Sequence, residues 1–377
     1  MRISDDELCP SNSACTDSQR YYQINEVLLG RLIMQYNLFR RLSLFSAMLA
    51  LCVVVLGAYV RLSDAGLGCP DWPGCYGALS VPQSETAIQK AQEIYPDRPI
   101  ETGKAWKEMA HRYLAGTLGL MVLAIFALAW RNKQRIKVHL RLPSALLLII
   151  AFQAILGMWT VTMLLKPVIV SAHLIGGMTT LAILTWIAHR HYGTFTNARA
   201  IAPILKVSIR GALLIVLAQV FLGGWTSTNY AALACTDFPT CHSVWLPQMD
   251  FKDAFHLVRE LGQSANGGNL TLSALTAIQW THRIGALITF VYLGSLALVI
   301  IKIPPLRKTA LLLLAALAAQ VSIGIANLIL QLPLVLAVAH NLGAALLVII
   351  TVVLNSKVTE PNLRNLDLRN IETGLGK

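Results

Sequence analysis

Four histidines lie within long apolar segments or at their mouths, where ionisable side chains are costly and usually functional. Two imidazoles facing each other across a helix bundle suit the axial positions of a heme iron, whereas a zinc site recruits further Cys, His or carboxylate ligands. The alternative is that each histidine only donates an interhelical hydrogen bond. We predict two bis-histidine heme sites, formed by His111 with His173 and by His282 with His340.

A small residue follows each of these histidines one helical turn later. Residues at i and i+4 share a helix face, so a small side chain there leaves room for a flat macrocycle beside the imidazole. The small residues are Ala115, Gly177, Ala286 and Ala344. No Cys-x-x-Cys-His motif is present, so covalent c-type attachment is not expected. The other histidines fall in connections and are interpreted as solvated: His139, His189, His191, His242 and His256.

One acidic residue distinguishes the two histidine pairs. Glu108 stands three residues before His111, whereas the same offset before His282 gives Gln279. Residues at i and i+3 share a helix face, so only the first pair has a carboxylate beside it. Such a carboxylate can take a proton or stabilise developing positive charge. The alternative is a solvated glutamate at a helix start, where its charge suits the helix dipole.

An arginine directly follows the first histidine of each pair, at Arg112 and Arg283. Guanidinium groups bind carboxylates bidentately, so heme propionates are candidate partners. Snorkelling to lipid phosphate is the alternative. Gln153 and Gln320 precede the second histidines and are interpreted as interhelical hydrogen-bonding residues.

Two short loops, CPDWPGC and CTDFPTC, carry four of the seven cysteines. Five residues separate the cysteines of each loop, and a proline among them favours a tight turn. We predict the disulfides Cys69–Cys75 and Cys235–Cys241, and redox-active pairs are the alternative. Cys52 falls inside an apolar segment and is interpreted as a small filler.

The spacing of these landmarks shows that the chain is a tandem duplication. A glycine stands twelve residues before the first cysteine of each loop, and a glutamine stands twenty residues before the second histidine of each pair. The glycines are Gly57 and Gly223, and the glutamines are Gln153 and Gln320. Each repeat holds an even number of helices, so both have the same orientation in a membrane.

The composition identifies an all-α polytopic membrane protein. Of its 377 residues 55% are hydrophobic and 13% are charged, far fewer charges than in soluble domains. We predict eight transmembrane helices arranged as two pseudo-symmetric four-helix bundles. The predicted spans are Leu42–Val60, Met109–Trp130, Pro143–Leu165, Val168–Ala188, Ile204–Thr226, Thr276–Ile301, Leu306–Leu330 and Pro333–Leu354. The predicted regions are an N-terminal segment 1–41, a first bundle 42–190, a linker 191–203, a second bundle 204–354 and a tail 355–377.

Charge predicts which loops face the cytoplasm. The net charge of +12 comes partly from connections 131–141, 189–210 and 302–308, which hold Lys and Arg but no acidic residue. Positive loops stay inside, so both termini are expected in the cytoplasm and both cysteine loops outside it. The basic charge therefore indicates topology rather than a nucleic-acid partner. Acidic residues in 1–41 argue against a mitochondrial transit peptide, and a bacterial inner membrane is expected.

Several motifs resemble the heme A synthase family, whose eukaryotic representative is a mitochondrial cytochrome oxidase assembly protein. They are GAYVRLSDAGLGCPDWPGC, then EMAHR from Glu108 to Arg112, then GGWTSTNYAALACTDFPTC and THRIG. The resemblance covers residues 42–354 in order. It implies oxidation of a heme O methyl group to a formyl group, through successive hydroxylation and loss of water, which gives heme A for terminal oxidases.

The resemblance also implies a role for each site residue. His282 and His340 would bind a heme b cofactor, His111 and His173 would receive the substrate heme O, and Glu108 would be catalytic. A heme O synthase is a candidate partner beside the lipid bilayer, and the oligomeric state is left open.

Two other functions fit the spacing of the histidines. A bis-histidine b-type electron-transfer cytochrome predicts hemes near opposite membrane faces, whereas all four histidines here lie near the outer ends of their spans. A heme transporter built from parallel repeats predicts broken helices and polar groups at the midplane, but the inner halves of these spans are almost wholly apolar.

Overall fold

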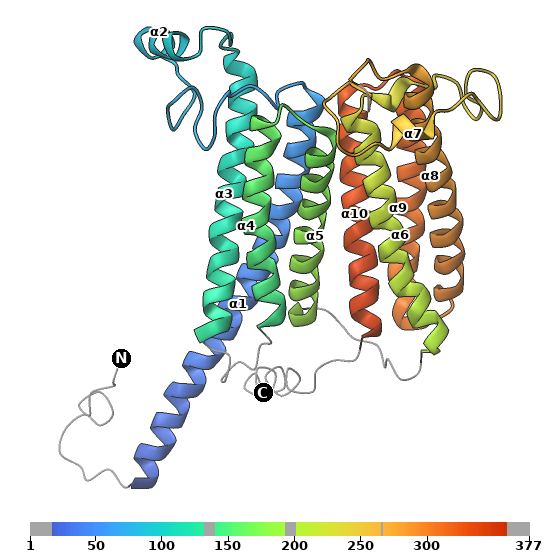
Figure 1. Cartoon of the computed structure of the whole chain (residues 1–377). Helices are drawn as coiled ribbons and strands as arrows, with labels where there is room; N and C mark the ends of the chain where they lie inside the picture. Colours follow the sequence, from blue (N-terminus) through green and yellow to red (C-terminus); the bar gives the residue numbers. More distant parts are fainter. Residues whose placement is uncertain (1–16, 132–139, 193–200, 265–266, 360–377) are drawn as a thin grey trace.

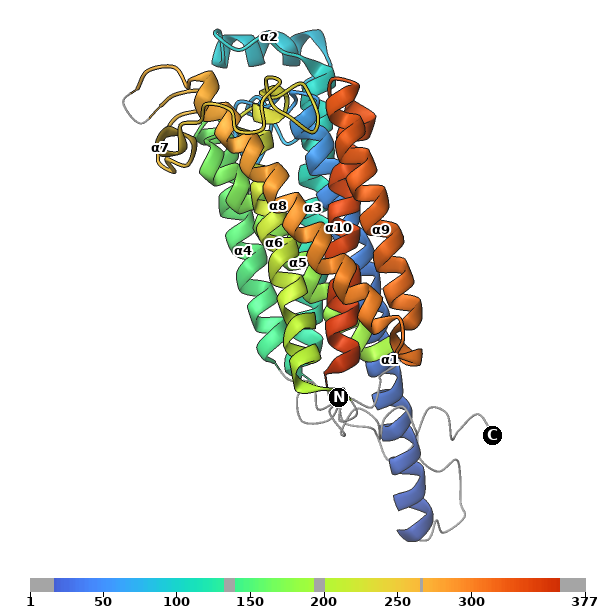
Figure 2. The same ribbon diagram turned by 90° about the vertical axis from the view of Figure 1, so that its right-hand side faces the viewer.

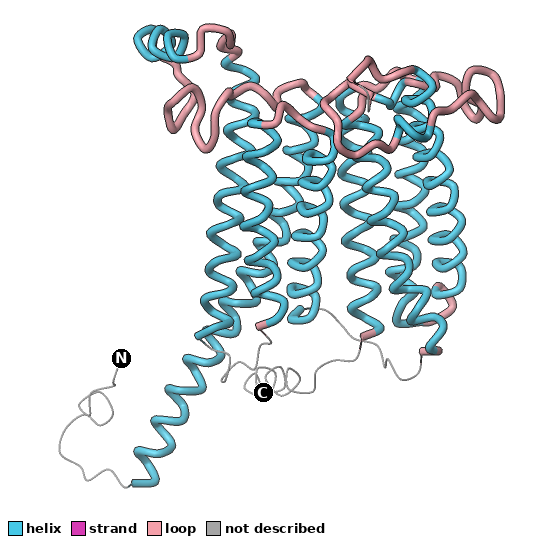
Figure 3. Tube along the Cα trace, viewed as in Figure 1, coloured by secondary structure: helices cyan, strands magenta, loops and turns pink. Residues whose placement is uncertain are grey.

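The computed structural model describes residues 17–131, 140–192, 201–264 and 267–359. These ranges contain helices joined by turns and loops, and no β-strand (Figure 3). Eight helices are long and apolar enough to cross a membrane, because a helix satisfies its own backbone hydrogen bonds in hydrocarbon. The predicted all-α polytopic membrane fold is confirmed.

Two groups of four long helices stand side by side (Figure 1). In each group the second and third helices pack together, the first and fourth pack together, and the first also packs on the second and the third on the fourth. The first group is α1 (Asp17–Leu62), α3 (Thr102–Arg131), α4 (Arg141–Thr162) and α5 (Pro167–Tyr192). The second group is α6 (Pro203–Thr228), α8 (Leu272–Ile300), α9 (Pro304–Ile329) and α10 (Leu334–Val358).

The two groups meet along their first and fourth helices. α5 packs on α10, α5 packs on α6, and α1 packs on α10. Exchanging α5 with α10 and α1 with α6 leaves this set of contacts unchanged, so the interface has the pseudo-twofold symmetry that the sequence repeat predicts. Large buried side chains on both sides of it, including Leu181 and Leu184 of α5 and Val348 of α10, belong to one continuous apolar core.

α1 begins earlier than the sequence predicts. It runs unbroken from Asp17 to Leu62, and its membrane-spanning part is Ile33–Leu62, so the helix continues below the bundle (Figures 1 and 2). Parts of the predicted N-terminal segment, linker and tail, residues 1–16, 193–200 and 360–377, lie outside the described residues, as do Cys9, Cys15 and His139.

The duplication extends to the backbone of equivalent turns. α4 ends in two left-handed residues, Leu164 with φ 48° and Leu165 with φ 59°. α9 ends in the same way, with Gln331 at φ 56° and Leu332 at φ 62°. In both turns the second left-handed residue donates its N–H to a carbonyl five residues back, at 2.9 and 2.7 Å, which closes the helix end. Non-glycine residues rarely adopt this conformation, so its recurrence at the same place supports a common origin.

Both cysteine loops lie at the same end of the molecule (Figure 1). The first loop holds the short helix α2 (Glu85–Ile94), and the second holds η3 (Ala231–Leu233) and α7 (Phe251–Ala254). Each loop has its own small core: Cys69, Cys75, Tyr76 and Met109 are buried in the first, and Trp225 anchors the second. Each loop is therefore folded over one four-helix group.

The first loop approaches α3 so closely that one position requires glycine. A Cβ atom on Gly68 would lie 2.6 Å from the carbonyl carbon of Lys104 and 2.7 Å from the nitrogen of Ala105. Backbone atoms cannot move aside as a flexible side chain can. We expect Gly68→Ala to displace the loop and to destabilise the protein by about 1–3 kcal/mol, the usual effect of overpacking.

Thermal unfolding of the purified protein in detergent measures this effect. Gly103→Ala on the adjoining first turn of α3 is the matched control, because a Cβ there meets nothing within 4 Å. It should leave the melting temperature unchanged or raise it slightly, since alanine favours helix. Equal melting temperatures for the two variants would contradict the close approach.

Candidate active site

The membrane histidines lie two in each group of helices. His111 of α3 and His173 of α5 belong to the first group, and His282 of α8 and His340 of α10 belong to the second. All four side chains are half-buried. Each histidine stands in the first half of its helix, which is the half nearer the cysteine loops.

Each imidazole packs edge-on against a glycine of the neighbouring helix. A Cβ on Gly57 of α1 would lie 2.9 Å from Cε1 of His111, and a Cβ on Gly223 of α6 would lie 3.1 Å from Cε1 of His282. The second histidines have the same arrangement: Gly157 of α4 faces His173, and Gly324 of α9 faces His340. The absence of a side chain lets each ring approach the backbone of the next helix.

Nδ1 of three of these histidines, His111, His173 and His340, is buried and has no hydrogen-bond partner. An imidazole whose proton is on Nδ1 has an unprotonated Nε2, which is then available as a metal ligand.

These donor sets fit heme better than a bare metal ion. Within the described residues no group of three or more His, Cys, Asp or Glu side chains could hold a metal ion. Each half instead offers two imidazoles, and three of the four have a buried Nδ1 without a hydrogen-bond partner. Two imidazoles complete the coordination of an iron whose remaining ligands come from a porphyrin. The residues present therefore fit a bis-histidine heme site in each half.

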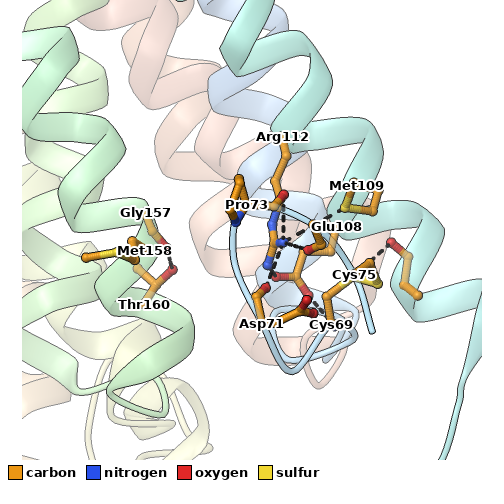
Figure 4. Close-up of polar contacts among 12 residues, drawn as sticks. Cys69, Asp71, Pro73, Cys75, Glu108, Met109, Arg112, Gly157, Met158 and Thr160 are labelled. Atoms are coloured by element: carbon orange, nitrogen blue, oxygen red, sulfur yellow. Dashed lines mark hydrogen bonds and ion pairs between the residues drawn. A yellow bond between two sulfur atoms is a disulfide. The ribbon is translucent and has the colours of Figure 1, made fainter. Parts of the chain in front are cut away.

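Glu108 is not a solvated residue at a helix start. Its side chain is 5% exposed, and its Oε1 pairs with the Arg112 guanidinium at 2.5 Å. Oε2 accepts a hydrogen bond from the backbone N–H of Cys69 at 3.0 Å. The carboxylate thus links the helix that carries His111 to the disulfide loop above it (Figure 4).

Arg112 holds the first cysteine loop by its backbone. Its guanidinium donates to the carbonyls of Asp71, at 2.9 Å, and of Gly74, and it lies 3.4 Å from that of Pro73 (Figure 4). Arg283 holds the second loop in the same way, through the carbonyls of Thr240 at 2.8 Å and Cys235 at 2.9 Å. Each arginine therefore binds the backbone of the loop above its own helix.

An aspartate closes each loop from inside. Asp71 accepts from the N–H groups of Tyr76 at 2.6 Å and Gly77 at 2.8 Å. Asp237 of the second loop accepts from the Thr240 hydroxyl at 2.6 Å and from two backbone N–H groups. These bonds, the Thr240 hydroxyl foremost, hold the pKa of the Asp237 carboxyl well below its usual value. Burial raises the pKa of the Tyr76 hydroxyl in the first loop.

Both predicted disulfides are present. Cys69 bonds Cys75 and Cys235 bonds Cys241, and all four residues are fully buried. Cys52 is a free thiol on an exposed part of α1.

One prediction about the other histidines is wrong. His191 is only 5% exposed, because α5 continues to Tyr192 and carries it into the helical bundle. Its Nδ1 lies 3.2 Å from the Tyr36 hydroxyl of α1. His189 likewise lies within α5, with Nδ1 3.0 Å from the Ser356 hydroxyl of α10.

Sequence reasoning missed the glycines as partners of the histidines. Gly57 and Gly223 stood out only as repeat landmarks, and Gly157 and Gly324 did not stand out. A signal was nevertheless present, because each of the latter two stands sixteen residues before the second histidine of its half. In each half these sixteen residues cross the short turn between the third and fourth helices, so the same glycine–histidine spacing occurs twice.

Fold and site together define a duplicated multi-pass membrane protein with a histidine pair in each four-helix group and a disulfide loop above it. The family described as "Cytochrome oxidase assembly protein" matches residues 40–352. The chain belongs to this family.

Curated relatives agree along most of their length. A protein of Shewanella oneidensis named heme A synthase is 44% identical over 310 residues, which cover 81% of this chain and 92% of the relative. Heme A synthase of Caulobacter vibrioides is 28% identical over 84% of this chain and 94% of the relative. Heme A synthase of Halalkalibacterium halodurans is 28% identical over 65% of this chain and 77% of the relative.

The contacts of Arg112 predict that this arginine protects the first disulfide from reduction. Cys69 and Cys75 are buried under a loop whose carbonyls this arginine holds. We expect Arg112→Ala to loosen the loop and to raise the rate at which a mild reductant opens the disulfide by about tenfold, as for loss of a charged hydrogen bond of ~1.5 kcal/mol.

Maleimide labelling after timed reduction, read by mass spectrometry of the first-loop peptide, measures this rate. The matched control is Lys104→Ala, which removes a cation of the same helix that pairs only with the exposed Glu101. The second loop provides an internal reference in each sample. Unchanged opening of Cys69–Cys75 in Arg112→Ala would show that the arginine does not hold the loop closed.

Proposed function

We propose that this chain is a heme A synthase, an oxidoreductase that converts a methyl substituent of heme O to a formyl group and so makes heme A for terminal oxidases. The observation that carries the proposal is a histidine pair in each half with a buried carboxylate beside only one of them. The half with the carboxylate is therefore suited to bind the reacting heme, and the other half is suited to hold a resident heme cofactor. The names of the curated relatives support the same activity.

We assign the substrate to the first half. His111 and His173 would hold the iron of heme O and so fix the position of the ring. The assignment is supported by Glu108, which shares a helix face with His111 and has the amide Gln279 as its counterpart in the second half.

We assign a resident heme b to the second half, held by His282 and His340. When bound, such a heme supplies reversible one-electron chemistry. The chain's own contribution is the pair of imidazoles, each oriented by a facing glycine of the neighbouring helix.

Glu108 is the candidate catalytic residue of the first half. Oxidising a methyl group to a formyl group removes protons as well as electrons, and a carboxylate beside the ring can accept a proton or stabilise positive charge. Its ion pair with Arg112 and its bond from Cys69 N–H fix the side chain. A carboxylate held in this way needs little reorganisation during the reaction.

We further propose that the cysteine loops face the outside of a bacterial inner membrane and that both termini face the cytoplasm. Basic connections at the opposite end of the helices support this orientation, and disulfides persist in an oxidising compartment. Heme O enters from the bilayer or from a heme O synthase that acts as a partner.

Two other functions are less well supported. A b-type electron-transfer cytochrome needs hemes that reach both membrane faces, whereas all four histidines stand in the halves of their helices nearer the cysteine loops. A heme transporter favours broken helices at the midplane, but the spans that carry the histidines are continuous helices.

Heme extraction tests the proposed activity. Protein purified from cells that make heme O should contain heme B together with heme O or heme A. His111→Ala should abolish heme A and keep heme B, whereas His282→Ala should remove heme B. Heme B alone, unchanged by heme O supply, would indicate the electron-transfer cytochrome.

The role of Glu108 is tested by Glu108→Gln, which copies the second half. Heme A formation should fall about a hundredfold, the usual contribution of a general acid or base, while the heme O content stays constant. Gln279→Ala is the matched control and should retain most activity. Full activity in Glu108→Gln together with loss in Gln279→Ala would reverse the assignment of the two halves.

A further inference from the structure

One of the four membrane histidines has a side-chain partner on its ring. Nε2 of Gln219, on α6, lies 3.0 Å from Nδ1 of His282 and donates to the carbonyl of His282 at 3.1 Å. Nδ1 of each of the other three has no ordinary hydrogen bond. Gln320, at the equivalent place in the α9–α10 pair, contacts only the carbonyl of His340, at 3.0 Å.

A glycine on α8 makes room for the Gln219 amide. Gly285 stands three residues after His282, and a Cβ there would overlap Oε1 of Gln219. The same combination occurs at both second histidines, where Gly176 faces Gln153 and Gly343 faces Gln320. Glutamine on one helix and glycine on the next are thus a paired feature of three histidine sites.

His111 is the exception. The repeat offset that relates Gly223 to Gly57 takes Gln219 to Val53, and the offset that relates His282 to His111 takes Gly285 to Leu114. Both members of the pair are therefore replaced by apolar residues in the first half. The side chain of valine offers no hydrogen bond to an imidazole. The two halves therefore differ in the residue beside the first histidine as well as at Glu108.

The chemistry of ligation determines what this amide does. An imidazole that binds iron through Nε2 carries its proton on Nδ1 and needs an acceptor for it. Oε1 of Gln219 is buried and has no other partner. A half-turn of the amide about its last side-chain bond exchanges its oxygen with its nitrogen, which places this acceptor at Nδ1 in exchange for the bond from Nε2 to the His282 carbonyl.

We propose that Gln219 is a positioning and tuning residue that accepts the Nδ1 proton of His282 and lowers the reduction potential of the heme in the second half. A hydrogen bond that draws on the Nδ1 proton makes the imidazole a stronger donor, and a stronger donor stabilises ferric iron. This inference rests on the assignment of heme b to His282 and His340. His111 of the first half has no such glutamine, so the proposal concerns the second half alone.

Redox titration of the resident heme tests the inference. The protein is purified from cells without heme O, so that heme B is the only heme, and its midpoint potential is followed optically. Gln219→Val combined with Gly285→Leu copies the first half and should shift the potential upward. Gln219→Glu supplies a stronger acceptor and should shift it downward.

The controls separate tuning from packing. Gln320→Val removes the equivalent glutamine, which does not contact the ring of His340, and should shift the potential far less. A purely structural role would move the valine and glutamate variants in the same direction, and that result would overturn the inference. So would equal potentials in all variants that retain heme. If His282→Ala left the heme in place, the assignment of heme b itself would fall, whatever the potentials.

If the variant with both Gln219→Val and Gly285→Leu binds no heme, the Gln219→Glu variant alone tests the inference. Resonance Raman detection of the iron–imidazole stretch gives a second readout in that variant. A higher frequency and a lower potential support the inference, and wild-type values for both would refute it.

Discussion

The close approach of an imidazole to the backbone of a neighbouring helix is the constraint on which both sites depend. A Cβ would crowd the ring at Gly57, Gly223 and Gly324, whereas at Gly157 it would make an ordinary contact, so glycine lets three of the four rings approach this closely. In a bilayer, where lipid is as apolar as leucine, such small residues also allow the helices to pack closely. Ligand geometry and helix packing are therefore determined together, and neither can change without the other.

The outer loops are also bound to the helices that carry the first histidine of each half. Arg112 and Arg283, one residue after the first histidines, hold the carbonyls of the disulfide loops, and Glu108 joins the Cys69 N–H to the helix of His111. A disulfide and an arginine thus fix each loop relative to a ligand helix. The halves differ at one position: the Glu108 carboxylate makes a further link in the first half, whereas Oε1 of its counterpart Gln279 has no hydrogen-bond partner.

Much of this arrangement could be predicted because the membrane simplifies the problem. Apolar runs longer than a bilayer predict helices, and matched His, Gln and Cys spacings predict the duplication and the pairing of ligands. Contacts between side chains and backbone could not be predicted. Arg112 and Arg283 suggested carboxylate partners by type, and their contacts with the backbone carbonyls of a folded loop were not indicated. His191 looked solvated because the apolar span seemed to end before it, although the helix continues past it.

The pseudo-twofold interface also bears on the origin of the chain. α5 and α10 pack on each other, and each carries the second histidine of its own half. An interface that a twofold axis maps onto itself is the kind found in symmetric homodimers. A four-helix ancestor could have paired with a second copy through this same surface. Gene fusion would then have freed the two copies to diverge, so that one kept a glutamate where the other has an amide.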